Sequence, residues 1–216
     1  MNRSIVIYVL GYILKTEGVL MSLPCLIALI YREKEGWAYF IVAMISILLG
    51  QLMSMRKPKD YVIYLKEGCV ATSLSWILMG VVGAIPFMIT GEIPSFINAL
   101  FEMVSGFTTT GASILSDVEA VSRCSTTLSC FSHWIGGMGV LVFVLALIPK
   151  SEGQDMFLMK AEVPGPIVGK LVSKVHMTAR ILYGIYAFLT VIEIIFLLFG
   201  GMPLFDSIVH AFSTAG

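Results

Sequence analysis

Long apolar runs separated by short charged stretches make up this 216-residue chain. A helix needs roughly 20 apolar residues to cross a hydrocarbon core of about 30 Å. Five runs reach or approach that length, at about 5–30, 37–53, 70–90, 128–148 and 181–199. Charged residues are 13% of the chain, against roughly 25% in soluble domains. We therefore predict an all-α integral membrane protein.

Two further apolar segments are too short to span a membrane. They run from Pro94 to Phe107 and from Pro203 to Phe212. We place the helix starts at the two prolines because proline suits the first turn of a helix. Each runs into a hydroxyl-rich stretch with a glycine, TTTG or STAG. Irregular backbone at membrane depth survives only where protein surrounds it or where it lines a wet cavity. These segments therefore predict re-entrant helices followed by pore loops.

The order of the segments predicts a partial internal repeat. After the first two spans, the chain has a span (70–90), a short helix, a polar loop and another span (128–148). The last span (181–199) and the second short helix repeat the beginning of this order. Both short helices carry an aromatic–acid pair. We divide the chain into an N-terminal two-helix region (1–66), a complete repeat (67–150), a cytoplasmic connector (151–177) and an incomplete repeat (178–216).

Lysine and arginine positions predict the orientation, because cytoplasmic loops are enriched in them. If the N-terminus is cytoplasmic, ten of these residues fall inside and only Arg32, Lys34 and Arg123 fall outside, with Lys15 unassigned. Both short helices and both hydroxyl-rich loops then lie on the outer side. The net charge is zero, so we expect no nucleic-acid partner.

The TTTG stretch is the candidate site. A bare cation needs oxygens that replace its hydration water, and the carbonyls and hydroxyls of Thr108, Thr109 and Thr110 offer both kinds. Gly111 can take the positive φ that turns successive carbonyls toward one axis. The preceding helix adds its negative C-terminal end, and no lysine or arginine adjoins the loop. The alternative is a Ser/Thr turn that caps a helix without an ion.

Two acidic residues in the short helices are candidate supporting groups. Glu102 and Asp206 either hold an outer vestibule negative or accept hydrogen bonds that brace the loop, and we favour bracing for Glu102. Glu193, inside the last span, has no visible partner. The GGMG stretch at 136–139 favours close helix packing, with a gating hinge as the alternative.

The four cysteines form no CxxC pair, so we interpret them as small buried apolar side chains and expect no metal site: Cys25, Cys69, Cys124 and Cys130. An intramembrane enzyme lacks support, because no Ser/His or Asp/Asp arrangement and no HExxH motif is present.

Four motifs together resemble the TrkH/KtrB family of potassium uptake proteins, and the TrkH branch most closely: FEMVSGFTTTGAS, HWIGGMGVLVFVLALIP, KAEVPGP and FDSIVHAFSTAG. The resemblance implies K⁺-channel-like M1–pore loop–M2 repeats, four around one pore, preceded by two extra helices. It places the first selectivity filter on Thr108, Thr109, Thr110, Gly111 and Ala112. It starts the second around Ser213, Thr214, Ala215 and Gly216, with Gly216 as the filter glycine or the residue just before it.

The resemblance also implies a function and partners. We expect potassium uptake across the inner (cell) membrane of a prokaryote, with K⁺ as the transported ion, no cofactor in this chain and no enzymatic activity. Expected partners are membrane lipid, a second copy in a homodimer, and a cytosolic nucleotide-binding (NAD/ATP) TrkA-type regulatory subunit near the KAEVPGP stretch (160–166). Only about one and a half repeats are present, so we expect a fragment of a longer protein. The alternatives are a non-transporting assembly subunit and an inactive truncated fragment.

Overall fold

The computed structural model describes residues 3–55, 65–115, 117–118, 120–139 and 175–216. Within these ranges the chain is helical, in agreement with the predicted fold class. The helices are α1 (Arg3–Leu20), α2 (Ser22–Tyr31), α3 (Gly36–Met55), α4 (Leu65–Thr90), α5 (Phe96–Phe107), α6 (Arg123–Gly137), α9 (Val175–Phe199) and α10 (Leu204–Ala215).

Four stretches of the described residues are long and apolar enough to cross a membrane: Arg3–Tyr31, Gly36–Met55, Lys66–Thr90 and Met177–Phe199. They correspond to four of the five predicted spans. The predicted span at 128–148 is described only as far as residue 139, and its helix α6 ends at Gly137. The KAEVPGP stretch and most of the predicted cytoplasmic connector lie outside the described residues.

The first span is interrupted at Met21, between α1 and α2, whereas its charged residues Lys15 and Glu17 lie within α1. Helical hydrogen bonding continues across Met21, because the Met21 N–H donates to the Glu17 carbonyl and the Cys25 N–H donates to the Met21 carbonyl. Pro24 has no N–H to offer the Leu20 carbonyl. The missing hydrogen bond explains why α1 and α2 separate at this point.

The short helices begin slightly later than their prolines predicted. Ser95 is the N-cap of α5, and Pro203 is the N-cap of α10. The second hydroxyl-rich stretch is also helical, because α10 continues through Ala215. The Thr214 hydroxyl donates to the His210 carbonyl over 2.8 Å, a bond that fits a helical turn. The predicted loop therefore does not begin before Gly216.

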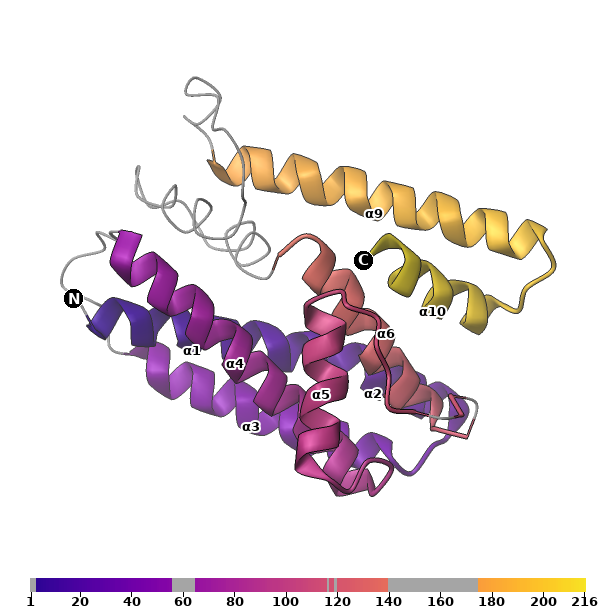
Figure 1. Cartoon of the computed structure of the whole chain (residues 1–216), viewed down its shortest axis with the longest axis horizontal. Coiled ribbons are helices and arrows are strands. Elements are labelled where there is room, and N and C mark those ends of the chain that lie inside the picture. The colour runs from indigo at the N-terminus through magenta and orange to yellow at the C-terminus, as the bar shows by residue number, and fades with distance from the viewer. Residues whose placement is uncertain (1–2, 56–64, 116, 119, 140–174) are drawn as a thin grey trace.

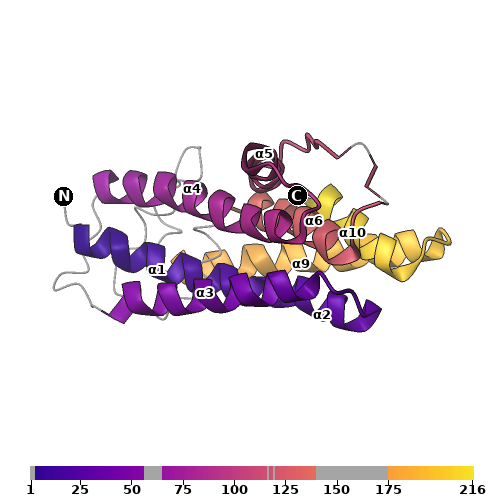
Figure 2. The ribbon, with the colours of Figure 1, turned by 90° about the horizontal axis from the view of Figure 1, so that it is seen from below.

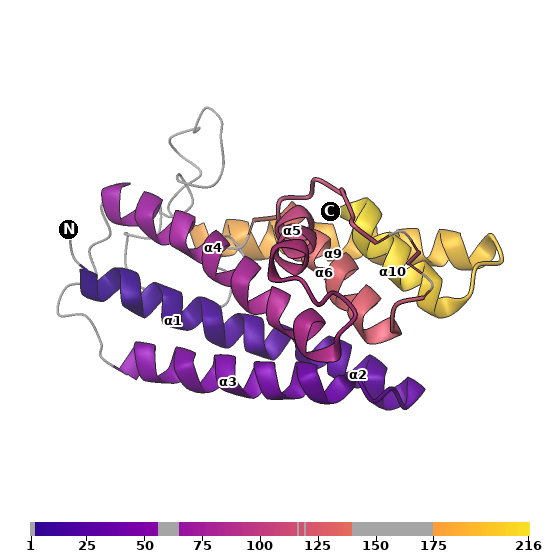
Figure 3. The ribbon, with the colours of Figure 1, turned by 60° about the horizontal axis from the view of Figure 1, so that its bottom comes forward.

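The N-terminal helices run along the long axis of the molecule, and α5 crosses them (Figure 1). In Figure 2, α5 is seen nearly end-on while α1, α3, α4 and α9 lie lengthwise. The backbones of α1 and α3 meet at two glycines: a Cβ on Gly11 would lie 2.9 Å from the Gly50 carbonyl oxygen. Helix α6 packs against α2, α5 and α10, and α9 packs against α10 (Figure 3).

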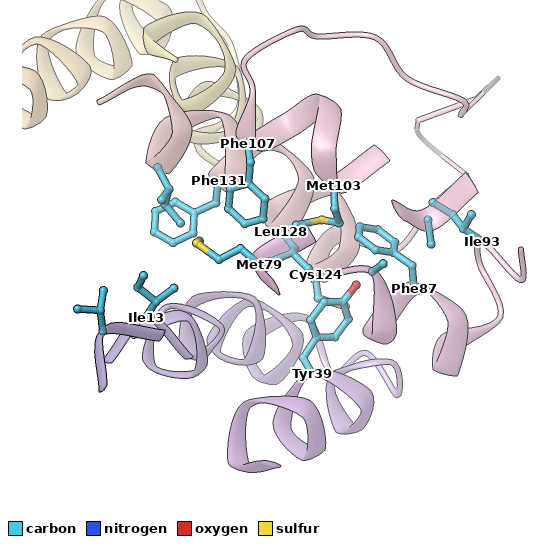
Figure 4. Close-up of a cluster of buried hydrophobic side chains, with 14 of the residues drawn as sticks. Ile13, Tyr39, Met79, Phe87, Ile93, Met103, Phe107, Cys124, Leu128 and Phe131 are labelled. Atoms are coloured by element: carbon cyan, nitrogen blue, oxygen red, sulfur yellow. The ribbon is translucent and has the colours of Figure 1, made fainter. Parts of the chain in front are cut away.

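The core lies where α5 and α6 meet the N-terminal bundle (Figure 4). It includes Met79 and Phe87 from α4, Met103 from α5, Leu128 from α6 and Tyr39 from α3. The outer surfaces are apolar as well, and only 6% of the spanning stretch of α9 is buried. A helix with an apolar exposed surface belongs in lipid or against further membrane helices. The short helix α5 packs against the full-length span α4 and against α6.

Candidate functional site

The TTTG residues leave the C-terminal end of α5 as a loop tied back to that helix. The peptide N–H groups of Thr108, Thr109 and Thr110 donate to the carbonyls of Val104, Gly106 and Ser105 respectively, each over 2.9 Å. The N–H and C=O groups of a trans peptide point in opposite directions. Because these N–H groups point back to α5, the carbonyls of residues 107, 108 and 109 point away from it.

Two residues of the loop have a positive φ angle. Thr109 has a φ of 55° and Gly111 a φ of 73°. Glycine takes this conformation readily, as predicted for Gly111, whereas a β-branched residue rarely does. The left-handed region costs roughly 1–2 kcal/mol for an L-residue. Strain of this kind at Thr109 is typical of functional loops.

The side chains of the loop are polar and open. Residues 108 to 114 are all exposed, and the hydroxyls of Thr108 and Thr110 lie 2.8 Å apart. The Thr108 hydroxyl also lies 2.7 Å from the Val104 carbonyl, to which it donates. The loop thus presents both carbonyl and hydroxyl oxygens beside the negative end of a helix. This arrangement suits a partly dehydrated cation.

Glu102 joins the returning part of the loop to α5 and α6. The residue is buried, with 4% of its surface exposed. One carboxylate oxygen accepts hydrogen bonds from the Ser113 hydroxyl at 2.9 Å and the Ile114 N–H at 3.2 Å. The other accepts from the Ser129 hydroxyl of α6, also at 2.9 Å. These contacts are the ones that a bracing role requires, and the role itself stays a prediction.

Asp206 has different surroundings. It is exposed in the first turn of α10, where a negative charge favours the helix N-terminus. The predicted second filter, residues 213–216, lies at the other end of the same helix, about 10 Å away along the axis. The structure therefore does not bring Asp206 to these residues. Ser213 instead lies within hydrogen-bonding reach of the Cys130 thiol of α6.

Helix α6 supports the C-terminal ends of both short helices at two successive glycines. A Cβ on Gly136 would lie 2.0 Å from the Phe107 carbonyl oxygen, and a Cβ on Gly137 would lie 2.8 Å from the Cα of Gly216. Figures 1 to 3 show the C-terminal end of α10 close to α5 and α6. The close packing predicted for the GGMG stretch is confirmed at both glycines.

Aromatic rings and hydrogen bonds join α6 to α9 and α10. The Trp134 ring stacks on Tyr186 at 5.1 Å between centroids and lies 5.9 Å from Phe212. The Trp134 indole N–H donates to the Thr190 hydroxyl over 3.0 Å. Glu193, on the same helix as Thr190, is half-buried. The second short helix is thus anchored to the first repeat through α6.

Sequence reasoning missed the hydrogen bonds that anchor the N-terminus of α6. Two carboxylates from distant turns accept hydrogen bonds from its N-terminus. Glu33 accepts from the N–H groups of Arg123 at 2.9 Å and Cys124 at 3.0 Å, and Glu92 accepts from the Ser122 N–H at 2.7 Å. The Ser122 side chain caps Ser125. Ser122 could have been predicted as an N-cap from its residue type. The local sequence does not predict contacts with carboxylates 30 and 90 residues away.

The cysteines are free thiols with unequal exposure. Cys124 is buried and Cys69 is exposed, so the interpretation of all four as buried side chains is wrong for Cys69. Cys69 lies in the first turns of α4, on an exposed face of that helix. No group of three or more His, Cys, Asp or Glu residues gathers at a metal-binding distance within the described ranges.

We expect Glu33→Ala to weaken the seat of α6, because two N–H groups at the helix N-terminus lose their acceptor. The expected loss in free energy of unfolding is about 1–2 kcal/mol. The measurement is the apparent unfolding temperature of the full-length protein in detergent. Glu35→Ala, in the same turn and with the same change of charge, serves as the control. Equal shifts in the two variants would contradict the anchoring role.

The sequence is similar to known cation transport proteins. A family model described as a TrkH cation transport protein matches residues 36–215. The Trk system potassium uptake protein TrkH of Salmonella typhimurium is 37% identical over 199 residues, which cover 90% of this chain and 41% of that protein. The Trk system potassium uptake protein TrkG of Escherichia coli is 34% identical, covering 99% and 45% respectively.

The crystal structure of the potassium transporter TrkH from Vibrio parahaemolyticus has a similar fold. Its TM-score is 0.81 at 29% sequence identity, and the alignment covers 99% of this chain and 43% of that one. The chain thus spans less than half the length of these relatives.

Proposed function

Because the chain belongs to the TrkH family of cation transport proteins, we propose that it forms the N-terminal part of the membrane subunit of a potassium uptake system. In this proposal residues 108–112 are one strand of a K⁺ selectivity filter. The observation that carries it is the direction of two peptides of the loop: the N–H groups of Thr109 and Thr110 bond back to α5, so the carbonyls of Thr108 and Thr109 face away from the helix end.

The chemistry of the loop favours a monovalent cation over an anion. Carbonyl and hydroxyl oxygens replace the hydration shell of K⁺, and the C-terminal end of α5 contributes a negative potential. An inside-negative membrane potential drives uptake by about 2.3 kcal/mol per charge for each 100 mV. No enzymatic step is needed for this process, and we propose that the chain catalyses none.

The complete filter needs further strands. One loop follows α5 in this chain, and α10 supports the start of another. Since Ser213, Thr214 and Ala215 are helical, we propose that the second strand begins at or after Gly216, as Thr108 follows the last residue of α5. We further propose that the full protein supplies the remaining strands, because relatives of the same family are more than twice as long.

The membrane setting and the partners follow the same proposal. Four candidate spans and bacterial relatives make this a membrane protein. We propose an inner-membrane location with a cytoplasmic N-terminus, supported by the distribution of lysine and arginine. The relatives are named as parts of a Trk system, which supports a cytosolic nucleotide-binding TrkA-type subunit and a homodimer as further proposals.

The test replaces Gly111 by serine in the full-length protein and measures K⁺ and Na⁺ uptake in bacteria that lack their own uptake systems. We expect K⁺-over-Na⁺ selectivity to fall at least about tenfold, equivalent to about 1.4 kcal/mol. A side chain at a φ of 73° is strained, and here the strain would reorient a filter carbonyl.

The matched control is Gly91→Ser. Gly91 has a φ of 79°, and a Cβ at either glycine would contact nothing within 4 Å. Gly91 lies in the turn after α4, outside the loop. The two variants therefore carry similar backbone strain, and only Gly111→Ser touches the candidate filter. Unchanged selectivity in Gly111→Ser would refute the filter assignment and favour an assembly role.

A further inference from the structure

Glu17 is a buried carboxyl in the middle of the first membrane span. It is 4% exposed, and neither of its side-chain oxygens has a hydrogen-bond partner among the described residues. Glu102, buried to the same extent in α5, accepts three hydrogen bonds. Two glutamates with equal burial thus have opposite surroundings. An isolated carboxylate in an apolar interior is so costly that it is normally paired or neutralised.

A small cavity of about 10 Å³ lies beside Glu17 and extends to the C-terminal end of the first short helix. Met79 of α4, Met103 and Phe107 of α5 and Ser132 of α6 contribute to its lining, together with further apolar side chains. This volume is about the size needed for one water molecule. Glu17 and Phe107, the residue that immediately precedes the TTTG loop, thus line the same cavity.

The lining excludes a bare metal cation as the occupant. Na⁺ or K⁺ needs several oxygens in place of its hydration shell, whereas the side chains here are thioethers, hydrocarbons and rings apart from Glu17 and Ser132. The Ser132 hydroxyl already donates to the Ser129 carbonyl over 2.6 Å, so it is left as an acceptor. A group with its own O–H donor fits that acceptor.

Other charged or titratable groups on the surrounding helices either have partners elsewhere or lie several helical turns from the cavity. The Lys15 ammonium lies over the Tyr12 ring at 3.9 Å, and the His133 Nδ1 lies 2.9 Å from the Ser129 carbonyl oxygen. Glu102 of α5 is bonded to the filter loop and to Ser129. On α4, Lys66 and Glu67 lie in the first turn, more than three helical turns before Met79.

We propose that Glu17 is a proton-binding site: a neutral carboxylic acid that holds one water between α1 and the C-terminal end of α5. The protonated carboxyl supplies one O–H donor and keeps an acceptor oxygen. The water accepts from Glu17 and donates to the Ser132 hydroxyl. Removal of the proton would leave a charge beside Phe107, so the seat of the pore helix depends on this proton.

The first test is infrared spectroscopy of the full-length protein in lipid at neutral pH. We expect a C=O stretching band of a protonated carboxylic acid that disappears in Glu17→Gln and persists in Glu102→Gln. Absence of such a band in the wild type, or its persistence in Glu17→Gln, would overturn the proposal. This readout needs no transport, so it is independent of the proposed function.

The second test compares the apparent unfolding temperatures of Glu17→Leu and Glu102→Leu. Leucine fills similar space and removes all hydrogen bonding. We expect Glu17→Leu to lie within about 2 °C of the wild type or above it, because no protein hydrogen bond is lost. A fall as large as that of Glu102→Leu would show that Glu17 is an ionised group with an essential partner, and would refute the neutral acid.

Discussion

Gly136→Ala is expected to reduce potassium uptake strongly, because α6 cannot accommodate a methyl group where it meets the end of α5. The added Cβ would lie 2.0 Å from the carbonyl oxygen of Phe107 and 3.0 Å from its Cα. The obstacle is backbone, which cannot rotate away as a side chain can. Forcing extra volume into a packed site costs about 1–3 kcal/mol, occasionally more.

The displaced carbonyl belongs to the peptide that leads into Thr108. A shift of this peptide moves the start of the TTTG loop, the proposed filter strand, so we expect Rb⁺ uptake by the full-length protein to fall at least about tenfold, equivalent to about 1.4 kcal/mol. The apparent unfolding temperature, measured in parallel, separates a misplaced loop from a protein that does not fold. Uptake at the wild-type rate would disprove the contact.

Two other glycines provide the controls. Gly184 on α9 has nothing within 4 Å of its Cβ position, and alanine there improves helix propensity by roughly 0.5–1 kcal/mol. Gly184→Ala should therefore keep full uptake. A Cβ on Gly106 would collide with the Ser132 hydroxyl, a side-chain atom that can rotate. Uptake by Gly106→Ala should therefore lie between that of Gly136→Ala and that of Gly184→Ala.

Glu102→Leu is expected to have the second large effect. Leucine leaves the Ser113 hydroxyl, the Ile114 N–H and the Ser129 hydroxyl without their shared acceptor. Hydrogen bonds to a charged group contribute about 1.5–3 kcal/mol, and we expect a loss of about 2–3 kcal/mol in total because water can reach the two exposed donors. K⁺-over-Na⁺ selectivity should fall with stability, as measured by uptake and thermal unfolding.

Glu102→Gln distinguishes bracing from an electrostatic role in a vestibule. The amide keeps one acceptor oxygen, and the Ser129 hydroxyl can reverse to accept from the amide N–H. Bracing therefore predicts a partial loss in Glu102→Gln and a full loss in Glu102→Leu. Equal losses of uptake in both variants with unchanged stability would instead assign the role to the charge.

The length of the apolar runs was the most informative signal in the sequence. It predicted four described spans and the short helix before the TTTG loop, because the thickness of a bilayer fixes how many helical residues cross it. The positive φ at Gly111 was predictable for a similar reason, since glycine takes this conformation at little cost. The positive φ at Thr109 was not, because tertiary context overrides the preference of a β-branched residue.

The start of α6 shows why other features escaped prediction. Residues 123–127 are polar and read as a loop, yet they form a helix. Glu33 and Glu92 accept hydrogen bonds from this end, and the Tyr39 hydroxyl bonds to Ser125. All three partners come from other helices or turns. Their contribution depends on the tertiary structure and leaves no periodicity in the local sequence.

The hydrogen bonds of the TTTG loop also bear on how the proposed pore could be assembled during synthesis. The hydrogen bonds described for residues 108–114 end on α5 or within the loop itself. Their partners lie no more than 12 residues away in the chain. The strand can therefore take its shape as soon as its own helix has entered the membrane, before later segments leave the ribosome. Under the proposed function, the pore of the full-length protein would then be assembled from strands that were already formed.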